Sequence, residues 1–222
     1  MLKNQMIRLN EDIKDCEYFK IPNSPCKRSK EANKIIHPIV HVPLNESQKI
    51  LIVSQSPSKE TDSKKVDENK ESPAKFRCRI YSLVFFGKDN KRYMKIVTDN
   101  YEELKKTFSK YFYWIHYFKC YPGKSKSGDK SPNKICANKY LKKEIEFIEP
   151  ELILTLGRLP KNYVSNLNLD CKIIHSLHPS GAARGYRKKY RFEETWEKYK
   201  KIFRDYFDEK DLKYIALLAN NP

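Results

Sequence analysis

The stretch of this chain best suited to chemistry is His178-Pro179-Ser180-Gly181-Ala182-Ala183-Arg184. It follows the apolar pair Ile173-Ile174, which predicts a strand, and it precedes a basic segment that predicts a helix. The proline restricts one backbone angle, and the serine and glycine after it suit a turn or a helix cap. Since open α/β sheets bind ligands at the carboxyl ends of their strands, His178 is a candidate for contacting a substrate. A surface histidine in an ordinary loop is the alternative.

A second polar turn follows the most strongly predicted strand. Lys49-Ile50-Leu51-Ile52-Val53 is almost continuously apolar, which is typical of a strand in the buried middle of a sheet. It runs directly into Ser54-Gln55-Ser56-Pro57-Ser58. Because the carboxyl ends of parallel strands meet at one edge of a sheet, the turns at 54–58 and 178–184 can face one cleft. Any enzymatic interpretation of the sequence depends on that geometry.

The elements that would position these turns alternate between strands and helices. We expect further strands over Phe76–Phe86, Tyr93–Thr98, Tyr111–Phe118, Leu152–Leu156 and Lys172–Ser176. Helices are expected within 1–15, from Asn100 to about Lys110, from Ser131-Pro132 to Pro150, over 160–166 and over 188–207. This order predicts an α/β sandwich with a mostly parallel sheet.

Composition favours a polyanionic partner. The chain has 222 residues, with 45 lysines and arginines against 28 acidic residues and a net charge of +17. Cationic surfaces gain affinity for phosphates by releasing counterions, and the fifteen tyrosines and eleven phenylalanines could stack on bases. The alternative is that the protein comes from a lysine-rich proteome, in which such a charge serves only to solvate the surface. With no apolar run near the roughly 20 residues of a membrane span, and no signal-peptide core, we expect an intracellular protein in the cytoplasm or nucleoid.

The length suits a single domain over residues 1–222. Within it, residues 1–47 form an N-terminal segment that carries Cys16 and Cys26, and the charged residues 59–75 predict a mobile loop. The six cysteines of a protein in a reducing compartment point to metal binding or burial before disulfides. Cys78 and Cys171 lie in predicted strands and are expected in the core.

Four pieces of the sequence, in order, resemble the uracil-DNA glycosylase superfamily, and specifically its iron–sulfur branch. The resemblance covers roughly residues 48–58 and 111–205. The pieces are the strand and loop Ile50–Ser58, the segment Lys119–Lys124 with Gly128-Asp129 and Cys136-Ala137, the helix–proline–strand–glycine run Ile148–Gly157, and His178-Pro179 with Arg184. The resemblance implies a three-layer α/β/α sandwich whose central, mostly parallel sheet has four strands.

The activity that this resemblance implies is hydrolysis of the N-glycosidic bond of uracil in DNA, after the base has flipped out of the helix. Gln55 and Ser56, with Pro57 and Ser58, would hold the base and position water. His178 would stabilise negative charge on the leaving base. Further base contacts are expected from Phe76 or Tyr121 by stacking and from His116, and DNA contacts from Ser180, Arg184 and Arg187. The partner would be single-stranded or damaged duplex DNA, bound by a monomer.

The resemblance also implies a metal site built from cysteines. Cys120 and Cys136 are spaced as in the iron–sulfur branch, and Cys16 and Cys26 are the candidates for the two remaining ligands. Four thiolates suit a [4Fe–4S] cluster, and tetrahedral zinc would accept the same ligands. The gap of ten positions between Cys16 and Cys26 is wider than the two-residue separation usual in the branch.

Three positions depart from the pattern of the family. Ser56 stands where several branches carry an aspartate or asparagine that activates water, and a serine is no general base at its ordinary pKa. His116 stands where the branch often carries an asparagine that contacts the edge of uracil, which leaves another deaminated base open as substrate. Ala183 stands where the family often carries a bulky residue that wedges the duplex open. A small residue at this position favours single-stranded or already distorted DNA as the substrate. A catalytically inactive member that only binds nucleic acid, and a zinc-stapled RNA-binding module, are the alternatives.

Overall fold

The computed structural model describes residues 2–16, 48–56, 75–120, 124–125, 128–129, 134–179 and 191–220. Its centre is a four-stranded sheet in the order β2-β1-β5-β6, and every neighbouring pair is parallel. The four strands are β1 (Ile50–Ser54), β2 (Phe112–His116), β5 (Leu152–Leu156) and β6 (Lys172–Ser176). A separate antiparallel pair joins the two-residue strands β3 (Lys124–Ser125) and β4 (Gly128–Asp129). The predicted α/β class with a parallel four-stranded sheet is confirmed.

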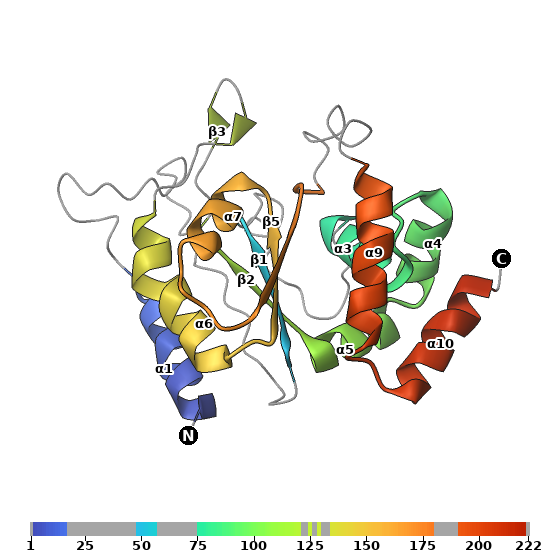
Figure 1. The fold of residues 1–222 in the computed structure, drawn as a ribbon, viewed down its shortest axis with the longest axis horizontal. Helices are drawn as coiled ribbons and strands as arrows, with labels where there is room; N and C mark the ends of the chain where they lie inside the picture. Colours follow the sequence, from blue (N-terminus) through green and yellow to red (C-terminus); the bar gives the residue numbers. More distant parts are fainter. Residues whose placement is uncertain are drawn as a thin grey trace.

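Helices cover both faces of the sheet, so the fold has three layers (Figure 1). One face carries α3 (Lys75–Phe86), α4 (Lys91–Asp99), α5 (Tyr101–Tyr111), α9 (Phe192–Arg204) and α10 (Glu209–Asn220). The other face carries α1 (Leu2–Lys14), the π-helix η2 (Ala137–Leu141), α6 (Lys142–Ile148) and α7 (Arg158–Ser165). Along β1, Ile50 and Ile52 pack into the first layer, whereas Leu51 and Val53 pack into the second. This period of two is what a strand that is buried on both faces requires.

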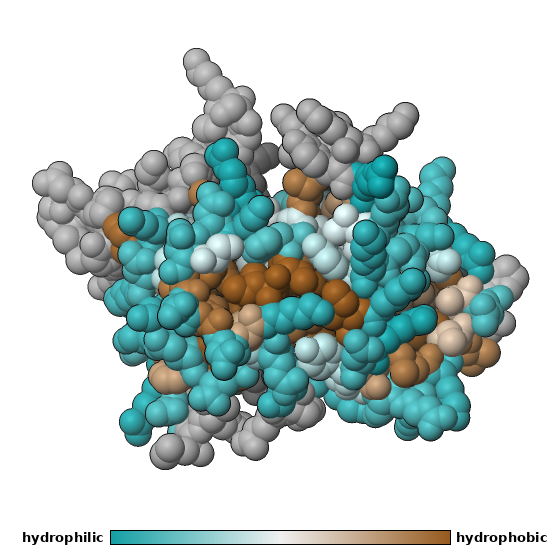
Figure 2. All heavy atoms as spheres, viewed as in Figure 1, coloured by the Kyte–Doolittle hydropathy of each residue, from teal (hydrophilic) through white to brown (hydrophobic). Residues whose placement is uncertain are grey.

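The strand β6 is the edge of the sheet that lies nearest the viewer in Figure 1. Figure 2 shows apolar side chains gathered across the middle of this face and hydrophilic side chains over the helices on both sides. The outer edge of β6 is partly covered by α9, because the Tyr199 hydroxyl donates a hydrogen bond to the carbonyl oxygen of His175. No helix in the described part of the chain is long and apolar enough to cross a membrane.

Two of the predicted strands are helices. Phe76–Phe86 belongs to α3 and Tyr93–Thr98 belongs to α4. Residues 80–86 are all buried, so α3 has no polar face, and a continuous apolar run does not distinguish a buried helix from a buried strand. For α4 the overlooked signal is Asn90, whose side chain accepts a hydrogen bond from the Tyr93 N–H at 3.2 Å as a helix N-cap.

The remaining predictions differ from the structure mainly at their ends. The helix expected from Ser131-Pro132 is described from Ile135 onward, and the helix over 188–207 is described as α9. The helix α10 was not predicted. Cys78 lies in a helix instead of a strand but is buried as expected, and Cys171 is half-buried just before β6. The charged loop over 59–75 lies outside the described residues except for Lys75, and of the segment 1–47 only α1 and the two residues after it are described.

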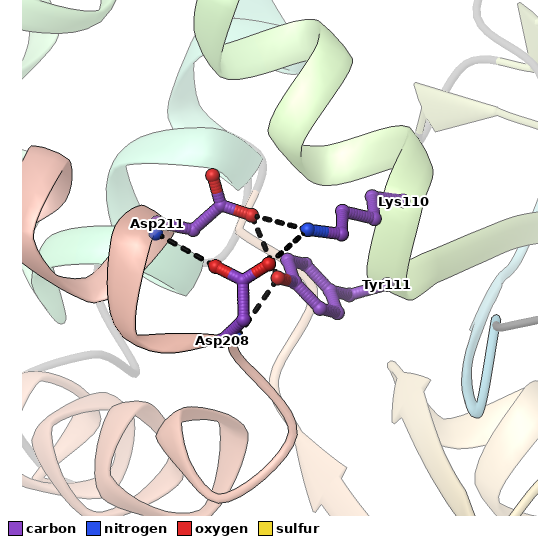
Figure 3. A network of polar contacts seen from close by, with 4 residues as sticks. All are labelled: Lys110, Tyr111, Asp208 and Asp211. Atoms are coloured by element: carbon purple, nitrogen blue, oxygen red, sulfur yellow. Dashed lines mark hydrogen bonds and ion pairs between the residues drawn. The ribbon is translucent and has the colours of Figure 1, made fainter.

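A polar network joins the end of α5 to the start of α10 (Figure 3). Lys110 contacts both Asp208 and Asp211, and the Tyr111 hydroxyl donates to Asp211 Oδ2 at 2.6 Å. Asp208 caps α10 by accepting the Asp211 N–H at 2.8 Å. Hydrogen bonding to Lys110, followed by the cap bond, lowers the pKa of Asp208 to about 2. The network therefore fixes the last helix to the layer that contains α5.

We predict that Asp208→Asn, which keeps an oxygen for the cap but removes the charge, destabilises the protein slightly at pH 7. Because the folded state lowers the pKa of Asp208 from its ordinary value near 3.8 to about 2, this stabilisation is present above about pH 4. It is lost as the pH falls through about 2, so the urea midpoints of variant and wild type should converge there. Asp205→Asn removes the same charge three residues earlier and is the control; an equal effect from it would contradict the role of Asp208.

Candidate active site

The carboxyl ends of β1 and β2 bring three polar or aromatic side chains together. Ser54 and His116 are the last residues of these strands and are paired in register. The Trp114 Nε1–H donates to Ser54 Oγ at 2.9 Å, and Ser54 Oγ lies 2.5 Å from His116 Nδ1. Positions 54, 114 and 116 alternate in step with Ile52 and Phe112, so all three side chains are on the face that carries α3. Ser54 and Trp114 were not predicted as site residues.

The backbone pairing of β1 continues past the end of the strand. The Tyr117 N–H donates to the Ser54 carbonyl oxygen at 2.7 Å, and the Phe118 N–H donates to the Gln55 carbonyl oxygen at 2.9 Å. Gln55 and Ser56 are half-buried. The backbone of Gln55, the predicted base contact, is therefore fixed where the sheet ends.

His178 is held at the same edge by an aromatic contact. Its ring is half-buried and stacks on the Phe76 ring, with centroids 5.1 Å apart and an angle of 9° between the planes. The Phe76 ring also lies 5.8 Å from that of Trp114, which is 6.1 Å from that of His116. Phe76 thus reaches the site from the first turn of α3. A chain of ring contacts joins the histidine after β6 to the histidine that ends β2.

Gly157 lies next to the His178 turn in a backbone conformation that requires glycine. It follows β5 with φ of 94° and ψ of 173°, a region that residues with a Cβ atom essentially do not adopt. Its N–H donates to the Ser176 carbonyl oxygen at 2.8 Å, which ties the ends of β5 and β6 together. A Cβ atom at this position would lie 3.5 Å from His178 Cβ. The glycine is therefore part of the site, as a backbone position.

Arg79 fixes the other side of the same turn. Its Nη1 donates to the Pro179 carbonyl oxygen at 2.9 Å, while its Nε lies 2.9 Å from Asp89 Oδ2. Both charged side chains are largely buried, so the carboxylate orients the guanidinium in a poorly solvated place. Nothing in the sequence distinguishes Arg79 as the positioning residue from Arg77, two residues earlier in α3.

The three described candidate metal ligands lie on the opposite face of the sheet. Cys120 is buried in the core of the second layer, and Cys16 and Cys136 are partly buried against it. The Lys119 N–H donates to Cys136 Sγ at 3.3 Å. Burial raises the pKa of the Cys136 thiol to about 12, with Cys16 close enough to add a smaller effect in the same direction. Within the described ranges, no group of three or more His, Cys, Asp or Glu side chains is arranged to hold a metal ion.

Several predicted site residues lie outside the described ranges. These are Pro57, Ser58, Tyr121, Cys26, Ser180, Arg184 and Arg187. Among the described candidates, the structure brings Phe76 into contact with His178 and brings His116 next to Ser54, the residue before Gln55. The described candidates Phe76, His116 and His178 therefore lie on one side of the sheet, and Cys16, Cys120 and Cys136 lie in the layer on the other side.

We predict that Gly157→Ala destabilises the protein by about 1–3 kcal/mol, because alanine would be strained in this backbone conformation. Gly87→Ala is the control away from the site: it places alanine at φ of 73°, and its Cβ would also lie 2.9 Å from the Glu197 side chain. Urea unfolding should reveal a loss of stability in both variants. Only Gly157→Ala should also shift the NMR signals of the His178 ring, and unchanged signals would contradict the assigned contact.

Comparison with known proteins agrees with this architecture. A model of the uracil DNA glycosylase superfamily matches residues 43–200, a range that contains all four strands of the parallel sheet and the polar stretches 54–58 and 178–184. No curated protein matches the sequence at a significant level. The family match covers well over half of the chain and includes Gln55, His116 and His178. The chain belongs to the uracil DNA glycosylase superfamily.

Proposed function

We propose that the protein is a DNA glycosylase that removes uracil or another deaminated base by hydrolysing its N-glycosidic bond. The observation that carries this proposal is the meeting of His178, Phe76 and the end of β1 at one edge and on one face of the sheet. Membership of the uracil DNA glycosylase superfamily supports the same activity. The net charge of +17 suits a substrate that is a polyanion.

In this mechanism the target nucleotide leaves the base stack, at a cost of a few kcal/mol, and its base stacks on Phe76. The imidazole of His178 lies over that ring, so we expect it to move toward the edge of the base when DNA binds. A hydrogen bond from His178 would stabilise the negative charge that develops on the base as the glycosidic bond breaks. Comparable donors contribute about 3–4 kcal/mol to the transition state.

The remaining roles fall to the polar turns. Gln55 would contact the base, and the Ser56 hydroxyl, with Pro57 and Ser58, would position water without acting as a general base. The turn after His178 would hold DNA phosphates through Ser180, Arg184 and Arg187. Arg79 and Gly157 position His178 and need not touch the DNA.

We further propose that the protein belongs to the iron–sulfur branch and that Cys16, Cys120 and Cys136, with Cys26, hold a [4Fe–4S] cluster. The placement of the three described candidate cysteines in one layer supports this ligand set, as does the N–H donor that faces Cys136 Sγ. Burial raises the pKa of Cys136 and so favours the protonated thiol. Binding of the cluster would favour the thiolate and would outweigh this effect of burial. The cluster would tie α1 to the segment after β2 and would take no part in cleavage, because the cysteines and His178 belong to opposite layers.

His178→Ala should reduce excision of uracil by roughly 100- to 1,000-fold while leaving DNA affinity within a few-fold of wild type. Excision would be measured on single- and double-stranded oligonucleotides by alkaline cleavage of the abasic site. The control is His175→Gln, because His175 contacts Thr155 and Ser165 on the α7 side of the sheet. An equal loss of affinity and rate in His178→Ala would contradict its catalytic role.

The same assay distinguishes the glycosylase proposal from the alternative of a catalytically inactive protein that only binds nucleic acid. If the wild type binds DNA but releases neither uracil, hypoxanthine nor xanthine, the glycosylase proposal is wrong. The serine at position 56, in place of a water-activating aspartate or asparagine, is the feature that favours this second candidate.

Protein purified without oxygen should be brown, with broad visible absorbance and about four iron and four sulfide ions per chain. Cys120→Ser should lose the colour and unfold at lower temperature, since only three thiolates would remain to bind the four iron ions of the cluster. Cys78→Ser, a buried cysteine of α3 in the other layer, should keep the colour. Colourless wild-type protein that contains stoichiometric zinc would replace the cluster proposal with a zinc site.

A further inference from the structure

Lys119 and Glu144 form an ion pair in the interior of the second layer. Lys119 Nζ contacts Glu144 Oε2, and the two side chains are only 2% and 1% exposed. Removal of two charges from water has a large free-energy cost, and their mutual attraction often does no more than offset it. Stability alone is therefore a weak reason for a charged pair in a layer that is packed mainly with apolar side chains.

The two partners come from the two segments that meet at Cys136. The N–H groups of Tyr117 and Phe118 continue the pairing of β2 with β1. The next N–H group, that of Lys119, donates to Cys136 Sγ at 3.3 Å. Glu144 belongs to α6, which follows Cys136 through η2. The ion pair thus joins the segment after β2 to the helix that begins next to this cysteine.

The positive end of the pair faces Cys136. Burial raises the pKa of the Cys136 thiol to about 12, and the cation of Lys119 is the largest effect that opposes this rise. The Lys119 N–H acts in the same direction as the cation, whereas the carboxylate of Glu144 has a smaller effect in the opposite direction. Because Coulomb interactions weaken with distance, this difference indicates that the ammonium group lies nearer to the sulfur than the carboxylate does.

We propose that the Lys119–Glu144 pair directs a fixed positive charge at the thiolate of Cys136, which strengthens retention of the metal centre and raises its reduction potential. The inference rests on the proposed four-cysteine site. Four thiolates give such a centre a net negative charge, and reduction makes that charge larger. A nearby cation therefore stabilises the bound form, and it stabilises the reduced form more. Glu144 keeps the ammonium group charged in a buried place, so both are positioning residues that act through Cys136.

The experiment reverses the pair without removing it. In Lys119→Glu/Glu144→Lys the two charges exchange places, and in Lys119→Met/Glu144→Leu both are replaced by apolar groups, a change that is often neutral for stability. Reduction potentials would be measured by spectroelectrochemistry on full-length protein purified without oxygen. The equilibrium constant for reduction should fall about tenfold in the apolar variant, which is about 59 mV for one electron, and further in the exchanged variant.

Retention of the metal is the second measurement. Transfer of iron from the protein to the chelator ferrozine should be slowest in the wild type, faster in the apolar variant and fastest in the exchanged variant. The control is Lys95→Asp/Asp99→Lys, which exchanges an exposed ion pair of α4 in the other layer and should change neither quantity. Thermal unfolding of each protein would be recorded to show that the variants are folded.

A pair that served only to stabilise the fold would give a different result. The exchanged variant retains a buried ion pair, so it would then match the wild type in potential and in iron transfer, and that outcome would overturn the proposal. Brown wild-type protein with unchanged potentials in both variants would overturn this inference and leave the cluster in place. Wild-type protein that holds no metal would overturn the metal site and this inference together. Stoichiometric zinc would overturn the claim about potential, and faster zinc loss from the exchanged variant would then support the role in retention.

Discussion

The alternation of side chains along strands that are buried on both faces is the constraint on which this structure depends. Every residue of β1, β2 and β5 is buried, so each side chain must enter one helical layer or the other. The same rule that sends Ile52 and Leu51 to opposite sides also sends Trp114 and His116 to the α3 layer. The described candidate ligands Cys16, Cys120 and Cys136 belong to the other layer, which contains α1 and α6. The proposed base contacts Phe76 and His116 and these candidate ligands therefore lie in opposite layers of the fold.

The second layer contains a buried ion pair that fits this division. Lys119 Nζ contacts Glu144 Oε2, and both side chains are almost completely buried. Burial raises the pKa of Glu144, and the cation of Lys119 acts against that rise. Burial of two charges has a large desolvation cost, and removal of either partner would leave the other uncompensated. Since Lys119 is next to Cys120 and donates its backbone N–H to Cys136, the pair also positions the candidate ligands.

The strands β1 and β5 were predictable because they are short and almost continuously apolar, and β1 is followed by a polar turn. The polar turns after the predicted strands also led to the prediction that His178 and Gln55 lie at the same edge of the sheet. What failed was the assignment of α3 and α4 as strands, since a helix buried on nearly all sides has no polar period in its sequence. The roles of Ser54, Arg79 and Gly157 were also missed. They depend on contacts between residues far apart in the chain, such as that of Arg79 with Pro179, and a single sequence carries no signal for such pairs.

The π-helix η2 follows Cys136 directly, and its wider turn absorbs one residue more than an α-helix would. Each residue of an α-helix rotates the chain by about 100°. The buried face of α6 is fixed against the sheet by Ile145, so the extra residue decides in which direction Cys136 projects. Deletion of a single residue from this turn would keep every thiol in the sequence and yet rotate one of them out of register with its neighbours. The spacing between cysteines in a sequence is thus an incomplete guide to whether they can share a metal, because the helix that follows one of them also affects the direction in which its side chain projects.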